Sequence, residues 1–289
     1  MHSDKDISRF SEISPRTAVI VAGLGLFMMT ILAFFANFFL FSNLIVPGDA
    51  KTTSVHIMAS GELLRIGISC FLVVALLDVV VAWALYVLLQ PVNKHLSLLA
   101  AWFRVVYAAI FATALNNLLS VLQLLTGADS FKVFATNQVH AQVMVFLSAF
   151  QSGWDIGLVL FGLHLLVLGS LVFKSGYIPR WLGVLLTISS VGYLVDGFGK
   201  FLLPDYHLAM TLFTGWGELF LMFWLLWRAM KGFDKRRFPG AAVALDGRAH
   251  REGDEKEKGG PNESHSLHTL WTTRSSSAQR GAKTCSQEQ

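Results

Sequence analysis

The fold is decided by the stretch ELLRIGISCFLVVALLDVVVAWALYVLLQ at residues 62–90, in which Asp78 is the one charged residue after Arg65. The hydrocarbon core of a bilayer is about 30 Å thick, and a helix needs about 20 apolar residues to cross it. This stretch is long enough and apolar enough to do so. It therefore predicts a transmembrane helix.

Five other stretches have the same length and character. The first opens with Ser14-Pro15, which is typical of a helix start with Ser as N-cap and Pro in the first turn. It is longer than the apolar core of a signal peptide, and no small-residue cleavage site follows it, so we expect it to be retained. The six predicted helices span about residues 17–46, 62–90, 96–126, 138–173, 178–203 and 206–230. The pattern predicts an all-α integral membrane protein, a bundle of six transmembrane helices.

Composition divides the chain into three parts. Of its 289 residues, 54% are hydrophobic and 15% are charged, whereas a typical soluble domain has roughly 25% charged residues. After Lys231 the sequence becomes rich in Gly, Ser, Lys and Glu, and such a segment buries too little apolar surface to fold. We therefore predict a cytoplasmic N-terminal segment (1–16), a membrane domain (17–230) and a disordered cytoplasmic tail (231–289).

Basic residues predict the orientation. With the N-terminus inside the cell, the cytoplasmic segments hold eleven lysines and arginines and the external loops hold three. The eleven are Lys5, Arg9, Arg16, Lys94, Lys174, Arg180, Arg228, Lys231, Lys235, Arg236 and Arg237, and the three are Lys51, Lys132 and Lys200. Cytoplasmic loops carry such an excess, so we expect a cell-membrane protein with both termini cytoplasmic. The net charge of +4 then needs no nucleic-acid partner.

Several short motifs recur in order along the membrane domain. They are LIVPGD at 44–49, ELLR at 62–65, Asp78, QPVNK at 90–94, FR at 103–104, LNN at 115–117, FGLH at 161–164, SGYIPR at 175–180, Asp196, LPDY at 203–206 and GE at 217–218. On these motifs the chain resembles, over about residues 14–230, the bacterial membrane family called domain of unknown function 4386. The resemblance implies a multi-helix membrane protein of unassigned role and supplies no catalytic residues.

Ionisable residues inside the predicted helices are the candidates for function. Each costs about 2.5–3.5 kcal/mol near the bilayer centre, so it needs a partner or a wet cavity. The candidates are Asp78, Arg104, Asp155, His164, Asp196 and Glu218. They either pair to fix helix packing or serve binding or transport, and the sequence leaves both readings open. The tight turn at 91–95 makes the second and third helices antiparallel neighbours, which predicts a structural ion pair between Asp78 and Arg104.

The fourth predicted helix carries small and polar residues on two opposite faces. Gly153, Gly157 and His164 share one face at 100° per residue. Ser148, Gln151, Asp155 and Gly162 form a stripe on roughly the opposite face. We therefore expect this helix to be buried within the bundle.

Polar side chains also gather in the outer halves of the helices, which predicts a water-accessible pocket open to the outside. Its candidate residues are Asn116, Asn117, Gln151, Asp155, Asp196, Thr214 and Glu218. Thr211, Thr214 and Glu218 are spaced to share one face of the sixth helix, with Glu218 at the pocket floor. Asp196 and Lys200 are spaced to pair along the fifth.

Three functions remain open. The leading one is a membrane protein that binds or passes a small solute or ion through the outer pocket. The first alternative is a membrane-embedded enzyme acting on a lipid or lipid-linked substrate with Asp155, His164 and Glu218. The second is a structural or assembly subunit. The sequence contains no GxSxG, HExxH or GxxxxGK motif, and His164 is the one histidine deep in an apolar run, so we predict no catalytic, cofactor-binding or metal-binding residues.

Overall fold

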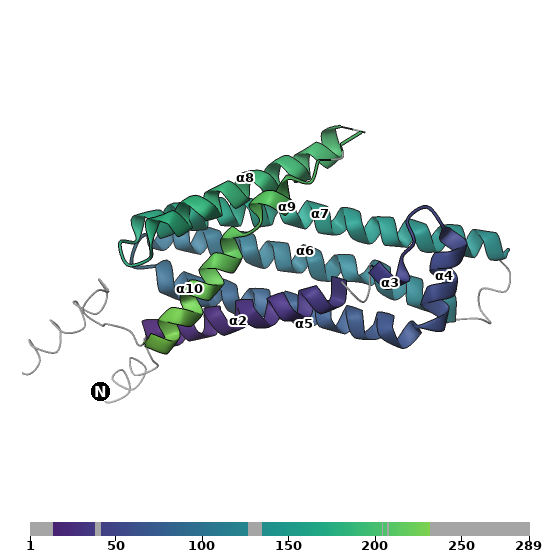
Figure 1. Cartoon of the computed structure of the whole chain (residues 1–289), viewed down its shortest axis with the longest axis horizontal. Helices are drawn as coiled ribbons and strands as arrows, with labels where there is room; N and C mark the ends of the chain where they lie inside the picture. Colours follow the sequence, from purple (N-terminus) through teal and green to yellow (C-terminus); the bar gives the residue numbers. More distant parts are fainter. Residues whose placement is uncertain (1–13, 38–41, 127–134, 204, 207, 232–289) are drawn as a thin grey trace, which may run out of the picture. The chain divides into compact units, whose positions relative to one another are not determined.

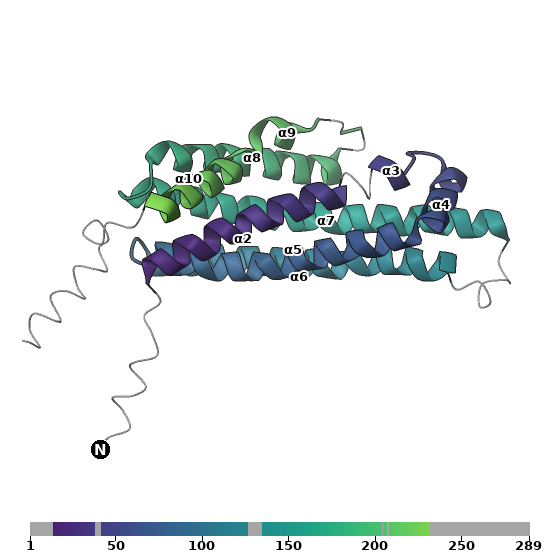
Figure 2. The same ribbon diagram turned by 60° about the horizontal axis from the view of Figure 1, so that its bottom comes forward.

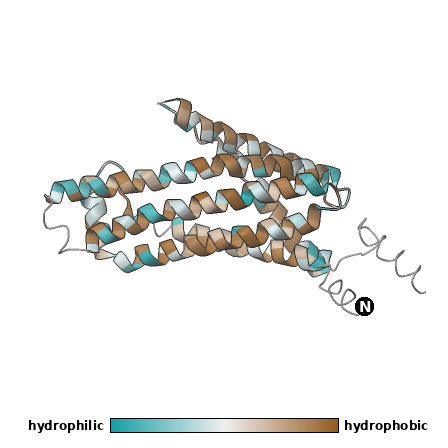
Figure 3. Ribbon diagram, turned by 180° about the vertical axis from the view of Figure 1, so that it is seen from behind, coloured by the Kyte–Doolittle hydropathy of each residue, from teal (hydrophilic) through white to brown (hydrophobic). Residues whose placement is uncertain are grey.

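The computed structural model describes residues 14–37, 42–126, 135–203, 205–206 and 208–231, and every regular element in this part of the chain is a helix (Figure 1). The six candidate membrane spans are α2 (Pro15–Ala36), α5 (Gly61–Leu89), α6 (Lys94–Thr126), α7 (Thr136–Lys174), α8 (Arg180–Leu202) and α9 (Met210–Thr214) together with α10 (Gly217–Lys231). Apolar residues cover the middle of the long helices, and hydrophilic residues gather mainly at their ends (Figure 3). The predicted all-α bundle of six membrane helices is therefore confirmed.

Most residues of two predicted segments lie outside the described part of the chain. Of the N-terminal segment 1–16, only residues 14–16 are described, and of the tail 231–289, only Lys231. The first span is shorter than predicted, because α2 ends at Ala36 and the chain continues, after the undescribed residues 38–41, into α3 (Ser42–Leu44). A turn with Gly48 at φ 81° then leads into α4 (Ala50–Ala59), whose N-cap is Asp49.

The six spans pack in a cyclic order. α2 packs on α5, α5 on α6, α6 on α7 and α7 on α8, while α10 contacts both α8 and α2. Figures 1 and 2 show α10 running obliquely between α2 and α8. Side chains that point inward from different spans can therefore meet in the centre.

Small residues bring α7 close to both of its neighbours. A Cβ added at Gly153 would lie 2.9 Å from the Ala114 Cβ atom on α6. On the other face, a Cβ at Gly169 would lie 2.9 Å from the carbonyl oxygen of Gly183 on α8. α7 is held between α6 and α8, in keeping with the two stripes in its sequence.

The sixth span is broken, which corrects the prediction of one continuous helix over 206–230. α9 ends at Thr214 and α10 begins at Gly217. The Ser189 hydroxyl on α8 donates to the carbonyl oxygen of Thr214 and accepts from the backbone N–H of Gly217 at 3.1 Å. A break at membrane depth needs such partners because lipid offers none. As a consequence, Thr211, Thr214 and Glu218 do not line one face of one helix.

Candidate functional site

The first candidate site surrounds Arg104, whose side chain is fully buried. Arg104 lies ten residues from the start of α6 at Lys94, which is about 15 Å at the rise of an α-helix. His164 lies ten residues before the end of α7 at Lys174, at the same depth. Both residues are therefore near the middle of a hydrocarbon core about 30 Å thick.

Three helices offer hydrogen-bond acceptors to Arg104. Its Nε donates to Asp78 Oδ1 on α5 at 2.9 Å. Its Nη1 donates to Glu218 Oε1 on α10 at 2.5 Å and to His164 Nε2 on α7 at 3.3 Å. The Arg104 Cζ atom also lies 5.4 Å from the centroid of the Phe161 ring. We call Asp78, Arg104, His164 and Glu218 the Arg104 cluster.

The tautomer of His164 follows from its second contact. His164 Nδ1 lies 2.8 Å from the carbonyl oxygen of Ala100. A carbonyl can only accept, so Nδ1 carries the hydrogen and Nε2 carries the lone pair that accepts from Arg104. His164 is thus a neutral acceptor in this arrangement.

Two buried atoms of the cluster have no hydrogen-bond partner within the described residues. They are Asp78 Oδ2 and Arg104 Nη2. The Asp78 side chain is 1% exposed, while that of Glu218 is 23% exposed. The two carboxyl groups therefore occupy unlike environments, with Asp78 the more enclosed.

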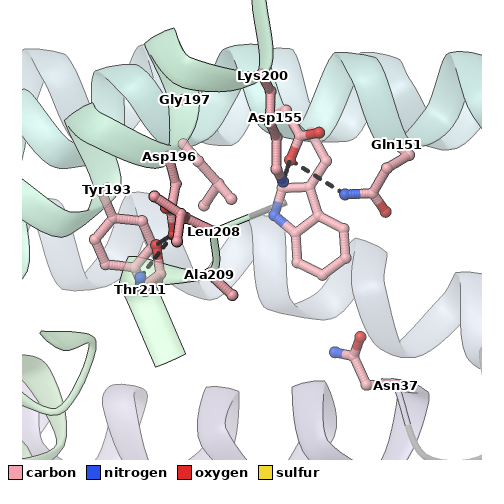
Figure 4. Close-up of a pocket in the computed structure, with 12 residues that line it drawn as sticks. Asn37, Gln151, Asp155, Tyr193, Asp196, Gly197, Lys200, Leu208, Ala209 and Thr211 are labelled. Carbon is pink, nitrogen blue, oxygen red and sulfur yellow. Dashed lines mark hydrogen bonds and ion pairs between the residues drawn. The ribbon is translucent and has the colours of Figure 1, made fainter. Parts of the chain in front are cut away.

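The second candidate site is a cavity of about 510 Å³, which we call the outer pocket after the predicted orientation (Figure 4). It lies among the final turns of α2 and α8, the middle of α7 and the start of α9. Its polar lining residues are Asn37, Gln151, Asp155, Tyr193, Asp196, Lys200 and Thr211. A cavity of this size can admit a small molecule.

One wall of the outer pocket is an ion pair between helices. Lys200 Nζ on α8 lies 2.8 Å from Asp155 Oδ1 on α7, and Gln151 Nε2 donates to the same oxygen at 3.2 Å (Figure 4). The Lys200 side chain is 42% exposed and that of Asp155 is 11% exposed. Lys200 is therefore the residue of this pair whose side chain is free to move away from the pocket wall.

Asp196, on the other wall, is held by four donors. It accepts from the Tyr206 hydroxyl at 2.6 Å, Met210 N at 2.9 Å, Thr211 N at 2.7 Å and Thr211 Oγ1 at 2.5 Å. Its hydrogen bond with Asp196 raises the pKa of Tyr206 to about 12. The expected Asp196–Lys200 pair is wrong, because the Tyr206 hydroxyl and the first residues of α9 occupy Asp196, while Lys200 pairs with Asp155.

Of the seven residues predicted for the pocket, the structure places three in its lining and four elsewhere. Gln151, Asp155 and Asp196 line it, whereas Asn116, Asn117, Thr214 and Glu218 do not. Asn117 Nδ2 donates to the Ala114 carbonyl oxygen within α6, and Thr214 Oγ1 donates to the Met210 carbonyl oxygen within α9. Glu218 turns to Arg104 because the break before α10 redirects it.

Sequence reasoning left some contacts out. The bond between Arg104 and His164 could have been predicted, since Arg104 lies ten positions after the start of α6 and His164 lies ten positions before the end of α7. The Glu218 contact could not, because Glu218 directly follows the helix break. In the described part of the chain, no group of three or more His, Cys, Asp or Glu side chains is placed to hold a metal ion.

Six apolar spans around a buried charge cluster define a polytopic integral membrane protein. The chain belongs to the family described as domain of unknown function (DUF4386), whose model matches residues 21–229. It is also 40% identical, over 164 residues, to an uncharacterized protein of Archaeoglobus fulgidus, a match that covers 57% of this chain and 83% of the relative. No solved structure matches the chain.

Proposed function

We propose that this membrane protein binds a small solute carrying an ammonium group in the outer pocket. The observation that carries the proposal is an open cavity of about 510 Å³, within otherwise apolar spans, lined by the Asp155–Lys200 ion pair. Charged side chains that serve helix packing alone would be expected in a closed core rather than around a cavity.

The charges of the pocket favour the ammonium group. Asp155 and Asp196 carry two formal negative charges, and Lys200 carries one positive charge. Asp196 already accepts from four donors, so Asp155 is the acceptor that a ligand would use. When the half-exposed Lys200 side chain moves aside, an ammonium group takes its place on Asp155 and, in a zwitterion, the ligand's carboxylate faces Lys200.

The pocket would face the outside of the cell. It lies at the end of α2 opposite Pro15 and near the end of α8 at Leu202. The excess of basic residues supports a cytoplasmic N-terminus. In that orientation, the proposed location is the cell membrane with both termini cytoplasmic and the pocket open to external solutes.

A thermal-stability screen of the purified full-length chain in detergent tests the proposal. The probes are ethanolamine, alanine, acetate and glycerol, which are a cation, a zwitterion, an anion and a neutral polyol. A ligand of the native state raises the apparent stability as its concentration exceeds the Kd. We expect ethanolamine or alanine to raise the unfolding temperature and acetate and glycerol not to.

Two variants complete the screen. Asp155→Asn should abolish the stabilisation by the amine, while the matched control Asn116→Ala, on α6 outside the pocket lining, should retain it. Stabilisation by acetate alone, equal stabilisation of Asp155→Asn, or no stabilisation by either amine would contradict the proposal.

A further inference from the structure

The formal charges of the Arg104 cluster do not balance. Asp78 and Glu218 are two carboxyl groups, Arg104 is one cation, and His164 accepts as a neutral imidazole. With both carboxyl groups ionised, the cluster would carry a net charge of −1 near the middle of the membrane. An uncompensated charge there is strongly unfavourable, so a counter-charge is expected.

Within the part of the chain that the structure describes, the other titratable and charged groups near the cluster supply no such counter-charge. Tyr107 on α6 and Tyr193 on α8 interact electrostatically with Arg104, and each is neutral in its protonated form. α2 packs against α5 and α10, and between Thr17 and Ala36 its sequence has no ionisable side chain. The simplest counter-charge is one proton on one of the two carboxyl groups.

The hydrogen bonds distinguish the two carboxyl groups. Glu218 Oε1 takes the short contact from Arg104 Nη1, as expected of an ionised acceptor beside a guanidinium. Asp78 uses only Oδ1, and its buried Oδ2 has no partner within the described residues. A neutral acid tolerates such burial better than a carboxylate does, because desolvation penalises the charged form.

We propose that Asp78 is a proton-binding site, with the proton on Oδ2 while Glu218 neutralises Arg104. The cluster then has one cation, one anion and two neutral members. Nothing in this assignment depends on the ligand of the outer pocket, so the two proposals can fail separately.

Proton binding at Asp78 would also depend on the position of α10. Glu218 lies in the first turn of α10, directly after the break, and its side chain is the more exposed of the two carboxyl groups. If Glu218 leaves Arg104, the guanidinium charge has only Asp78 to neutralise it. Asp78 then releases its proton to water, and the cluster remains neutral.

Infrared spectroscopy of the full-length chain in detergent tests whether a carboxyl group is protonated and whether that group belongs to an aspartate. A protonated carboxylic acid gives a C=O stretching band that a carboxylate lacks, and aspartate labelled with carbon-13 shifts that band only if an Asp carries the proton. At neutral pH, we expect one such band in the wild type, shifted by the aspartate label. Absence of the band, or a band that the label leaves unshifted, would overturn the assignment to Asp78 without any variant.

Variants test the identity of the residue and its link to Glu218. Asp78→Asn should remove the band, while Asp155→Asn, which changes an aspartate already paired with Lys200, should keep it. Glu218→Gln should also remove the band although Asp78 is still present, because Asp78 must then ionise to neutralise Arg104. Glu218→Ala serves as a second variant if Glu218→Gln does not fold. An aspartate band that persists in the folded Glu218 variant would overturn the link.

Discussion

Arg104 on α6 and Glu218 on α10 lie 114 positions apart in the chain and meet through an Nη1–Oε1 contact of 2.5 Å. Glu218 lies in the first turn of α10, directly after the break that separates it from α9. The contact connects the last membrane span to the centre of the bundle, where Arg104 also reaches Asp78 and His164. The stability of the bundle should therefore depend on Arg104 more than on any single apolar contact.

Arg104→Ala should destabilise the protein by about 3–5 kcal/mol, because it leaves the ionised Glu218 without its buried partner. Adding Glu218→Gln should recover part of this loss, and should recover more than Asp78→Asn does, since Asp78 is the neutral acid. The measurement is unfolding in detergent with increasing denaturant. No recovery in the Arg104→Ala, Glu218→Gln double variant would contradict this prediction.

Ser189→Ala should lower the stability by about 1–3 kcal/mol, because it leaves two backbone groups at the helix break unsatisfied. The matched control is Ser170→Ala, because the Ser170 hydroxyl donates to the carbonyl oxygen of Val167 in its own helix. Thermal unfolding of both variants measures the difference. Equal effects would show that Ser189 does not support the break.

The hydrogen bond between Tyr206 and Asp196 predicts a dependence on high pH. The folded protein holds the Tyr206 pKa at about 12, above the value of about 10 for free tyrosine. The stabilising contribution of this bond is complete below pH 10 and is lost as the pH rises through 12. Absorbance titration of tyrosinate should show a group that titrates near pH 12 and disappears in Tyr206→Phe. An unchanged titration in that variant would contradict the assignment.

The basic residues predict that both termini are cytoplasmic. A reporter enzyme that works only outside the cytoplasm, fused after Arg237, should be inactive, while the same reporter in the 127–134 connection should be active. Activity of the fusion after Arg237 would reverse the orientation and place the outer pocket on the cytoplasmic side.

Much of the fold could be predicted from the sequence because length and hydropathy identify each membrane span. The contact between Asp78 and Arg104 follows in the same way, since a tight turn sets the register of α5 against α6. The break at residues 215–216 could not be predicted, because its backbone groups find a partner in Ser189 on another helix. Gly215 and Gly217 on either side of Trp216 were its one local signal.

The pocket was harder to predict than the spans for a related reason. Depth in the membrane grouped Gln151, Asp155 and Asp196, which all line the cavity, but depth does not say which way a side chain points. Asn116 is exposed on α6 and lies away from the cavity. By sequence spacing, Lys200 could pair with either Asp196 or Asp155. Backbone N–H groups of α9 bind Asp196, and the spacing of residues along one helix does not predict such contacts.

The central claim, a water-filled pocket open to the outside, is tested most directly by cysteine accessibility in a background without Cys70 and Cys285. We predict that Gln151→Cys and Ala209→Cys, both in the pocket lining, react with a membrane-impermeant thiol reagent added outside intact cells. Val195→Cys is the matched control, since Val195 adjoins Asp196 but is 41% exposed on α8 outside the pocket lining, and it should stay unmodified. Protection of both pocket cysteines in correctly inserted protein, or their reaction only from the cytoplasmic side, would contradict the account.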